Sequence, residues 1–238
     1  MIRPVKIIKT RFFMLYRLLF FVSFMPLFTH AEVTPFKGEF LFKGPVLTLT
    51  TLREMNIDDN LGRFTFSGKN AIGNLRISST FSINNDELES LDYEFRARAA
   101  LIINRKQKLV FDENIASSGD HDWVISKESI SNKVLDPLTA QLALASKIAQ
   151  GKQEVALFLP NLKNGEIESN EFMLVQGESL IIDGIEYECA VAQRIRENDN
   201  RVTKYWFAKS LDYLLVKTVD VDDNGTVEMT MTKLLSFG

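Results

Sequence analysis

Hydrophobic and polar side chains alternate along most of this chain. Residues 75–81 read Leu-Arg-Ile-Ser-Ser-Thr-Phe, and residues 185–191 carry Ile, Tyr, Cys and Val at every second position. A period of two places one set of side chains on the buried face of a β-strand and the other set in water. Runs of the same kind lie at 40–52, 64–66, 91–95, 205–207, 214–221 and 227–231. The pattern therefore predicts a series of short strands.

Short polar segments rich in Asn, Asp, Ser and Gly separate these runs. They occupy residues 56–60, 84–86, 117–120, 197–200 and 222–225. Such residues favour tight turns because their side chains bond the local backbone or because they tolerate positive φ. Strands joined by tight turns run antiparallel. The sequence thus predicts a mainly β fold, a curved antiparallel meander with the shape of an open barrel or half-barrel.

Residues 136–150 follow a helical period instead. The apolar residues Leu138, Leu142, Ala145 and Ala149 recur at spacings of three and four, with Leu144 and Ile148 beside them. Asp136 can cap the first free amides, Pro137 suits the first helical position, and Gly151 is a natural terminator. We expect one main α-helix here, whose apolar stripe packs against the sheet.

The first 31 residues have the three parts of a secretory signal. Five basic and no acidic residues come first, an apolar run follows at 18–28, and small side chains stand at Thr29 and Ala31. The run is about half of the roughly 20 residues that span a bilayer, so we expect cleavage and no lasting membrane span. A retained N-terminal anchor is the alternative. The prediction is a signal peptide at 1–31 and a single β-rich domain at 32–238 in a bacterial periplasm.

Charge and cysteine content narrow the function classes. Without the signal peptide, 23 Lys and Arg stand against 31 Asp and Glu, a net charge of −8. An acidic protein is a poor ligand for nucleic acid or for anionic lipid head groups, so we expect no nucleic-acid partner. The single cysteine, Cys189, excludes an internal disulfide, and stability must come from a packed core.

The second half of the chain resembles the bacterial exported family known as Domain of Unknown Function 3108. The similar segments are LDPLTAQLAL, GIEYECAVA, RVTKYWFAKSLDYLLVKT and VDVDDNGTVEMTMTKL, in that order over about a hundred residues from Leu135. The resemblance implies an exported, mostly antiparallel β protein without an assigned reaction, and it carries over no catalytic residue. The layout is also broadly similar to periplasmic lipoprotein carriers, which is an analogy of fold alone.

Metal and cofactor signals are weak. His121, between Asp120 and Asp122, is the one histidine after the signal peptide, and we interpret it as part of a polar turn. Residues 220–225 match the first half of a calcium loop, but its twelfth position is Met231 and its flanks are strand-like. A hairpin turn explains this segment better, and we expect no metal and no cofactor.

Catalytic motifs are also missing. The chain has no G-x-S-x-G elbow, no phosphate loop and no dinucleotide fingerprint. Cys189 shares a strand face with apolar residues, where a buried thiol is inert. Glu186 and Glu188 share the other face of the same strand, and exposure explains them more simply than glycoside hydrolysis. We therefore expect no catalytic residue and a protein that is not an enzyme.

The aromatic residues are the remaining signal. Tyr205, Trp206, Phe207 and Tyr213 cluster around one hairpin, and they are our candidate ligand-binding residues. Because successive residues alternate, Trp206 should face away from its two neighbours. An aromatic core is one interpretation, and an apolar groove is the other. The preferred hypothesis is a non-catalytic protein of envelope maintenance that binds a lipid or an envelope protein. The alternative is an envelope glycan hydrolase that uses paired carboxylates.

Overall fold

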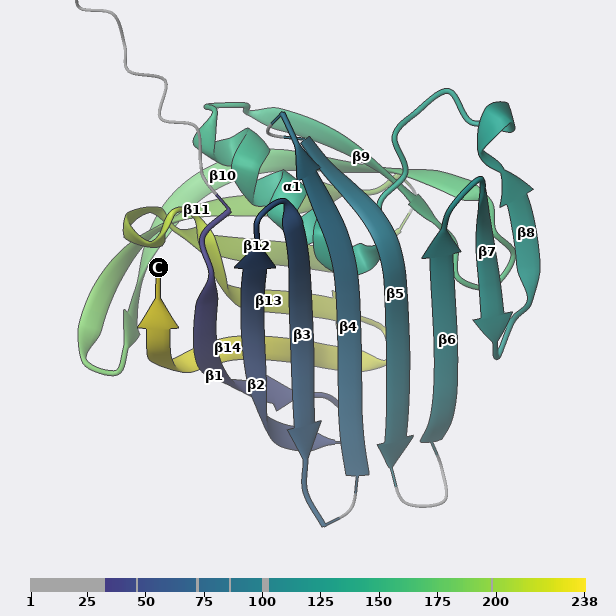
Figure 1. The fold of residues 1–238 in the computed structure, drawn as a ribbon. Helices are drawn as coiled ribbons and strands as arrows, with labels where there is room; N and C mark the ends of the chain where they lie inside the picture. The colour runs from purple at the N-terminus through teal and green to yellow at the C-terminus, as the bar shows by residue number, and fades with distance from the viewer. Residues whose placement is uncertain (1–32, 46, 72, 86, 100–102, 198) are drawn as a thin grey trace, which may run out of the picture.

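Strands joined end to end by short turns dominate the fold (Figure 1). The computed structural model describes residues 33–45, 47–71, 73–85, 87–99, 103–197 and 199–238, so the expected signal peptide lies outside the described residues. The strands of the first half are β1 (Phe36–Lys43), β2 (Thr48–Asp58), β3 (Leu61–Lys69), β4 (Gly73–Asn84), β5 (Glu87–Ala99), β6 (Ile103–Phe111), β7 (Asn114–Gly119) and β8 (Trp123–Ser126). Those of the second half are β9 (Glu154–Pro160), β10 (Ile167–Ile182), β11 (Ile185–Ile195), β12 (Val202–Ala208), β13 (Leu214–Asp222) and β14 (Gly225–Phe237).

These fourteen strands of the described chain form one antiparallel sheet. Its order is β8-β7-β6-β5-β4-β3-β2-β1-β14-β13-β12-β11-β10-β9. Consecutive strands pair with each other, except β8 and β9, and β1 also pairs with β14, which joins the two halves. The outermost strands, β8 and β9, do not pair with each other, so the barrel stays open. The prediction of a curved antiparallel meander around one helix is confirmed.

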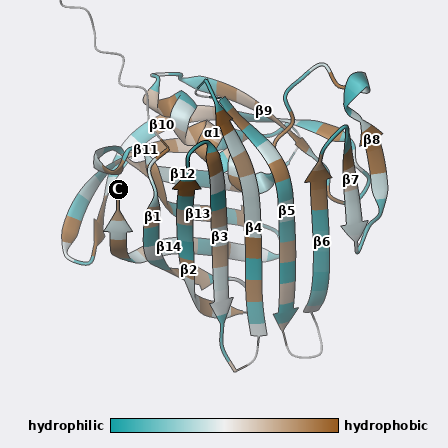
Figure 2. Ribbon diagram, in the orientation of Figure 1, coloured by the Kyte–Doolittle hydropathy of each residue, from teal (hydrophilic) through white to brown (hydrophobic). Residues whose placement is uncertain are grey.

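Alternation along the strands separates a buried face from an exposed one. Hydrophobic and hydrophilic bands alternate along the strands that face the viewer in Figure 2. Irregular register then bends the sheet, because a bulge adds a residue to one strand and increases its twist. Such shifts occur between β1 and β14, β4 and β5, β10 and β11, and β12 and β13. As a result the strands of the second half cross behind those of the first (Figure 1).

One glycine on the inner face of the curved sheet leaves space for an aromatic side chain of the core. Gly62 on β3 lies opposite Phe81 on β4, and a Cβ at position 62 would lie 2.1 Å from the Phe81 ring. The Phe81 side chain is completely buried. The aromatic ring thus covers the glycine and fills the space that a larger residue would need.

The helix α1 (Pro137–Ala149) lies between the two halves of the sheet (Figure 1). Pro137 opens the helix as predicted, and Gly151 follows its end with a φ of 82°. The buried side is wider than the predicted stripe, since Leu144 and Ile148 are more buried than Leu142 and Ala145. The physical reason is that the sheet wraps around the helix and contacts more than one side of it.

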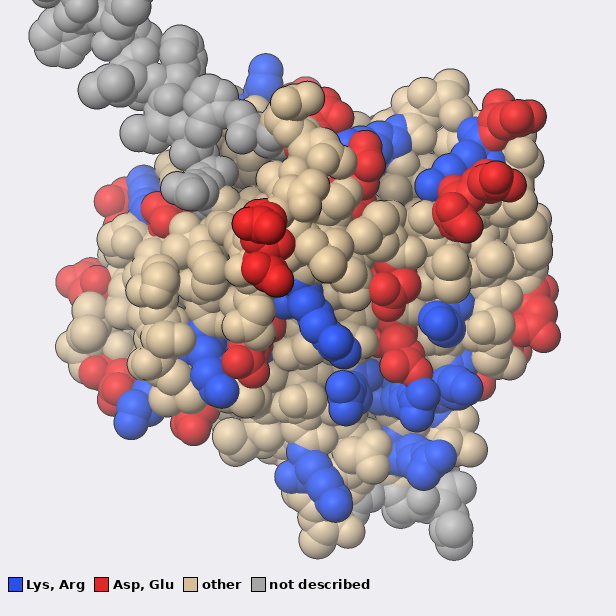
Figure 3. All heavy atoms as spheres, viewed as in Figure 1, with Lys and Arg blue, Asp and Glu red and all other residues tan. Residues whose placement is uncertain are grey.

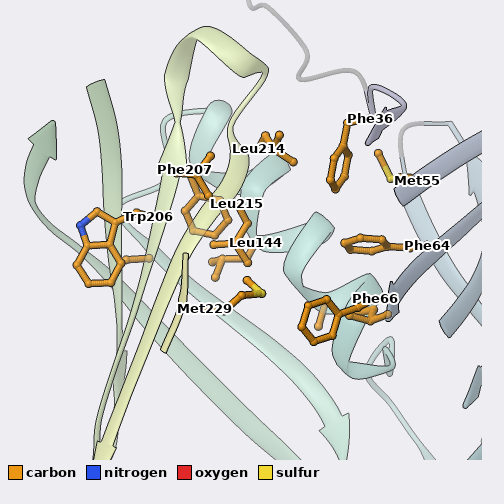
Figure 4. Packing of buried hydrophobic residues seen from close by; sticks show 14 of the residues in the cluster. Phe36, Met55, Phe64, Phe66, Leu144, Trp206, Phe207, Leu214, Leu215 and Met229 are labelled. Atoms are coloured by element: carbon orange, nitrogen blue, oxygen red, sulfur yellow. The ribbon is translucent and has the colours of Figure 1, made fainter. Parts of the chain in front are cut away.

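Figure 4 shows how the core is built around the helix. Phe207 and Leu215, from β12 and β13, point toward Leu144 of the helix. Phe64 and Phe66 of β3 lie on the other side of α1. The helix therefore fills most of the interior at one end of the open barrel, and side chains of both sheet halves pack on it.

Asp136 anchors the start of the helix in the sheet. Its Oδ1 accepts hydrogen bonds from the backbone amides of Leu138 (2.9 Å) and Thr139 (3.1 Å). Its Oδ2 accepts from the hydroxyls of Ser79 on β4 (2.8 Å), Ser90 on β5 (2.7 Å) and Thr139 (2.5 Å). Burial raises the pKa of Asp136, and the hydrogen bonds from Ser90, Thr139 and Ser79 act in the opposite direction. The helix cap is thus also the polar link between helix and sheet.

We expect Asp136→Ala to lower the free energy of unfolding by about 3 kcal/mol. The substitution removes a helix cap and leaves the buried hydroxyls of Ser79 and Ser90 without their acceptor, losses of about 1 kcal/mol and 1–3 kcal/mol respectively. Urea denaturation followed by circular dichroism measures the change. Asp58→Asn, at an exposed carboxylate, is the control and should change stability by less than about 0.5 kcal/mol. An Asp136→Ala protein as stable as the parent would contradict the anchoring role.

Candidate functional site

An open cavity of about 790 Å³ lies on the concave side of the sheet. Its apolar walls come from the first half of the sheet and from the β9–β10 connection, and include Phe42, Phe66, Leu75, Ile77, Tyr93, Phe95, Ala97, Leu159 and Leu162. These positions lie on the inward-facing side of strands β1, β3, β4 and β5, as the period of two requires. The helix contributes Pro137 to the lining, so α1 closes one end of the space.

Polar side chains line the part of the cavity nearest to solvent. Arg105 donates a hydrogen bond from Nε to Asp120 Oδ2 at 2.6 Å, and this bond lowers the pKa of Asp120. Glu168 Oε1 accepts a hydrogen bond from Asn161 Nδ2 at 2.6 Å. These pairs satisfy both carboxylates that border the cavity.

Arg194 on β11 differs from the other charged groups of the lining. It stands opposite Phe172 of β10 and is half-buried. Its Nε is shielded from solvent and has no hydrogen-bond partner. Within the described residues no carboxylate lies within 4 Å of its guanidinium. A cation of this kind in an apolar wall would be stabilised by an anionic group in the cavity.

Trp123 of β8 contacts the β9–β10 connection at the open side of the barrel. Trp123 of β8 donates a hydrogen bond from Nε1 to the Leu162 carbonyl at 3.2 Å. Its ring also covers Gly165, where an added Cβ would lie 2.9 Å from the indole and where φ is 82°. This contact brings the β9–β10 connection over the cavity, although β8 and β9 form no ladder.

A second, much smaller cavity of about 40 Å³ lies beside Arg53 of β2. The Arg53 side chain is buried, and its guanidinium lies over the rings of Phe40 and Phe64 at 5.2 and 4.8 Å. Its Nη2 donates to Gln141 Oε1 of the helix at 2.9 Å, while its Nε has no partner. Burial lowers the pKa of Arg53 to about 9, so the side chain is charged at neutral pH.

The predicted aromatic residues do not border the large cavity. Phe207 and Tyr205 face the helix side, where Tyr205 contacts Phe172 edge-on at 5.7 Å. Trp206 points away from them (Figure 4), donates to Glu178 at 3.0 Å and lies 5.1 Å from the ammonium group of Lys217. Tyr213 lines the small cavity. The structure does not bring the four together at one surface, and their role in ligand binding stays a prediction.

Other segments named from the sequence have structural explanations. The Asp222–Gly225 segment is the hairpin turn between β13 and β14, as expected, and Gly225 has a φ of 126°. The His121 backbone carbonyl accepts hydrogen bonds from Gln107 and Ser117, and His121 also borders the cavity. Cys189 is completely buried, and burial raises the pKa of its thiol to about 11.

The residues that the structure describes contain no group of three or more His, Cys, Asp or Glu that could hold a metal ion. No helix among them is long and apolar enough to cross a membrane.

Comparison with known proteins shows the fold alone. No known family model and no curated protein matches the chain. Among solved structures, the chain is similar to the crystal structure of a beta-barrel-like protein of Domain of Unknown Function 1849 from Brucella abortus. The TM-score is 0.52, with 8% sequence identity, and the match covers 85% of this chain and 98% of that chain. The β-barrel-like architecture is thus shared with a domain of unknown function.

We expect Arg53→Met to leave stability unchanged or to raise it by about 1 kcal/mol, because it replaces a buried charge that lacks a carboxylate with an apolar chain of similar length. Arg53→Ala should instead cost about 3 kcal/mol, because it leaves a cavity among the Phe rings. Urea denaturation of both variants measures the difference.

The stability difference between the parent and Arg53→Met should depend on pH. A lowered pKa in the folded state means that the unfolded chain binds more protons than the folded protein at pH values above about 9. The folded protein therefore recovers stability as pH rises above about 9. The advantage of Arg53→Met over the parent should be constant from about pH 6 to 8 and shrink above about 9. A constant difference up to about pH 11 would contradict the assigned burial of the charge.

Proposed function

We propose that this chain is a non-catalytic periplasmic protein that binds the acyl chain of a hydrophobic ligand in the 790 Å³ cavity, in the service of envelope maintenance. The observation that carries the proposal is the cavity itself. Its volume falls in the range of small-molecule sites, about 300–1,000 Å³, and its walls are mostly apolar side chains with a few polar groups at the open side.

Burial of an acyl chain in such a cavity provides enough free energy for binding. Each buried methylene contributes about 0.8 kcal/mol, so about twelve methylenes contribute about 10 kcal/mol. Immobilisation of the ligand offsets several kcal/mol of this gain. A dissociation constant in the micromolar range follows.

Arg194 favours a ligand whose head group is anionic. The Arg194 side chain lines the cavity, and a carboxylate or phosphate there would accept a charge-assisted hydrogen bond from its guanidinium. The two carboxylates of the lining do not compensate it, because Asp120 is paired with Arg105 and Glu168 with Asn161. A fatty acid or an acidic phospholipid has the required combination of tail and head.

The alternative, a glycan hydrolase with paired carboxylates, has less support. A general acid needs a raised pKa, whereas the hydrogen bond from Arg105 lowers the pKa of Asp120. Asp136 does have a raised pKa, but it is completely buried and accepts five hydrogen bonds. Glu186 and Glu188 are exposed on β11 and lie outside the lining of the cavity.

The family assignment is a separate proposal. We infer kinship with Domain of Unknown Function 3108 from the four sequence segments after Leu135. The shared architecture with a beta-barrel-like protein of Domain of Unknown Function 1849 is compatible with it, because the kinship implies a mostly antiparallel β protein. A sequence of intermediate similarity that links this chain to both groups would support the kinship.

The proposed function can be tested with a substitution that fills the cavity. Ala97 lies between Leu75 and Arg105 across neighbouring strands on the inner face, so Ala97→Phe should place a ring in the cavity. We expect at least a tenfold weaker affinity for cis-parinaric acid, a fluorescent fatty acid, because the ring occupies the space of several methylenes. Fluorescence titration of parent and variant measures it.

Two further variants make the experiment specific. Val110→Phe places the same ring on the outer face of β6, where the side chain is 38% exposed, and should leave the affinity unchanged. Arg194→Gln should weaken cis-parinaric acid and leave a neutral probe, N-phenyl-1-naphthylamine, unaffected. If the parent protein binds neither probe, or if Ala97→Phe and Val110→Phe behave alike, the proposed function is wrong.

A further inference from the structure

A row of like charges crosses the outer face of the sheet. Arg76 of β4 stands directly opposite Arg96 of β5, and Arg96 stands directly opposite Lys106 of β6. All three side chains are exposed. Like charges in directly opposed positions destabilise a sheet, so a fold has no structural reason to place them there.

More basic side chains surround this row. Lys69, Arg98 and Lys108 are exposed on the same face of β3, β5 and β6, and Figure 3 shows the blue side chains gathered over these strands. We call the six residues Lys69, Arg76, Arg96, Arg98, Lys106 and Lys108 the basic face. Glu94, one row away, pairs with Arg96 through a hydrogen bond of 2.6 Å. In the described part of the chain, the side-chain nitrogens of the other five have no carboxylate oxygen within 4 Å, although the Lys106 backbone amide donates to Asp120.

The basic face contains a shallow depression. Lys69, Arg76, Arg96 and Arg98 border it, together with Ser67 and Asn74, and its volume is about 450 Å³. Four cations around one depression produce a local positive potential that attracts anions from solution. This potential contrasts with the net charge of −8 that the sequence predicts for the exported chain.

The basic face lies back to back with the cavity. Arg76 and Arg98 point outward, while their chain neighbours Leu75 and Ala97 point inward and line the cavity. Leu75 borders both the depression and the cavity. The N-terminal end of β4 and the C-terminal end of β5 therefore carry cationic side chains on the outer face of the sheet. On the inner face, the same segments form part of the apolar cavity wall.

We propose that the basic face docks this protein on a membrane surface rich in anionic phospholipid. Phosphate groups of the lipid neutralise the opposed cations, which removes the repulsion between Arg76, Arg96 and Lys106. The charges extend over the outer side of four neighbouring strands, which matches an extended surface better than a single ion. The inference deepens the proposed function, because docking at this edge brings a source of acyl chains next to the cavity.

The experiment measures binding to lipid vesicles by flotation. The probes are vesicles of pure phosphatidylcholine and vesicles that also contain phosphatidylglycerol, and every variant carries an identical N-terminus. We expect binding only to the anionic vesicles, with a loss of affinity as salt increases. Each Lys or Arg near an anionic surface contributes roughly a fivefold gain in affinity, so Arg76→Gln with Arg96→Gln and Arg98→Gln should weaken binding about 100-fold.

A matched triple variant controls for net charge. Lys127→Gln with Lys152→Gln and Lys233→Gln removes three exposed cations outside the basic face and should bind anionic vesicles as the parent does. The basic-face variant should also unfold at an equal or higher urea concentration, because repulsion is relieved, so its lost binding cannot result from unfolding.

Several outcomes would overturn the proposal. They are equal binding to neutral and anionic vesicles, equal losses in both triple variants, or binding to a soluble polyanion such as heparin without binding to vesicles. The proposed function is tested separately, because the basic-face variant should still bind cis-parinaric acid from solution. Loss of vesicle binding with intact fatty-acid binding supports docking. Loss of fatty-acid binding in the Ala97→Phe variant supports the cavity as the binding site and does not bear on membrane docking.

Discussion

The hydrogen bonds to Asp136 are the constraint on which the interior depends. A sheet as wide as this one encloses more space than its own side chains fill, and the helix must occupy part of that space at a fixed depth. The Asp136 carboxylate fixes the depth, because it holds the first turn of α1 to Ser79 of β4 and Ser90 of β5. With the helix held at this point, its apolar residues pack at one end of the barrel, and the space in front of Pro137 stays open as the cavity.

Much of the fold could be predicted because its determinants are local. Alternation along residues 75–81 and 185–191 and the capping residues of 136–150 specify strands and helix without knowledge of tertiary contacts. The strands β6 to β10 escaped prediction. In β6 and β10, charged or polar residues such as Arg105 and Asn170 occupy inward-facing positions and break the apolar alternation. The residues 117–119, predicted as a turn, continue β7, since Ser117 finds buried partners in Gln107 and the His121 carbonyl.

Less of the candidate site than of the fold could be predicted from the sequence. Aromatic density pointed to residues 205–213, but density does not reveal whether rings fill a space or border it. The cavity arises where the helix ends and the opposed strands diverge, which is a property of the whole sheet. Arg53 and Arg194 could have been noticed in the sequence, because each places a charged side chain among the inward-facing residues of its strand. Net charge does not reveal the basic face, because it sums the charges of the whole chain without regard to their position.

The pairing of β1 with β14 has a consequence for how the chain acquires its structure. These strands lie almost 200 positions apart, as the hydrogen bond between Thr232 and the Glu39 carbonyl illustrates with a separation of 193. The closing of so long a loop is slow, because its entropy is lost before the contact forms. The two sheet halves can each form as local hairpins, but the helix gains its second wall only once the final strand has been synthesised. The interior is therefore complete only when the last strand pairs with the first.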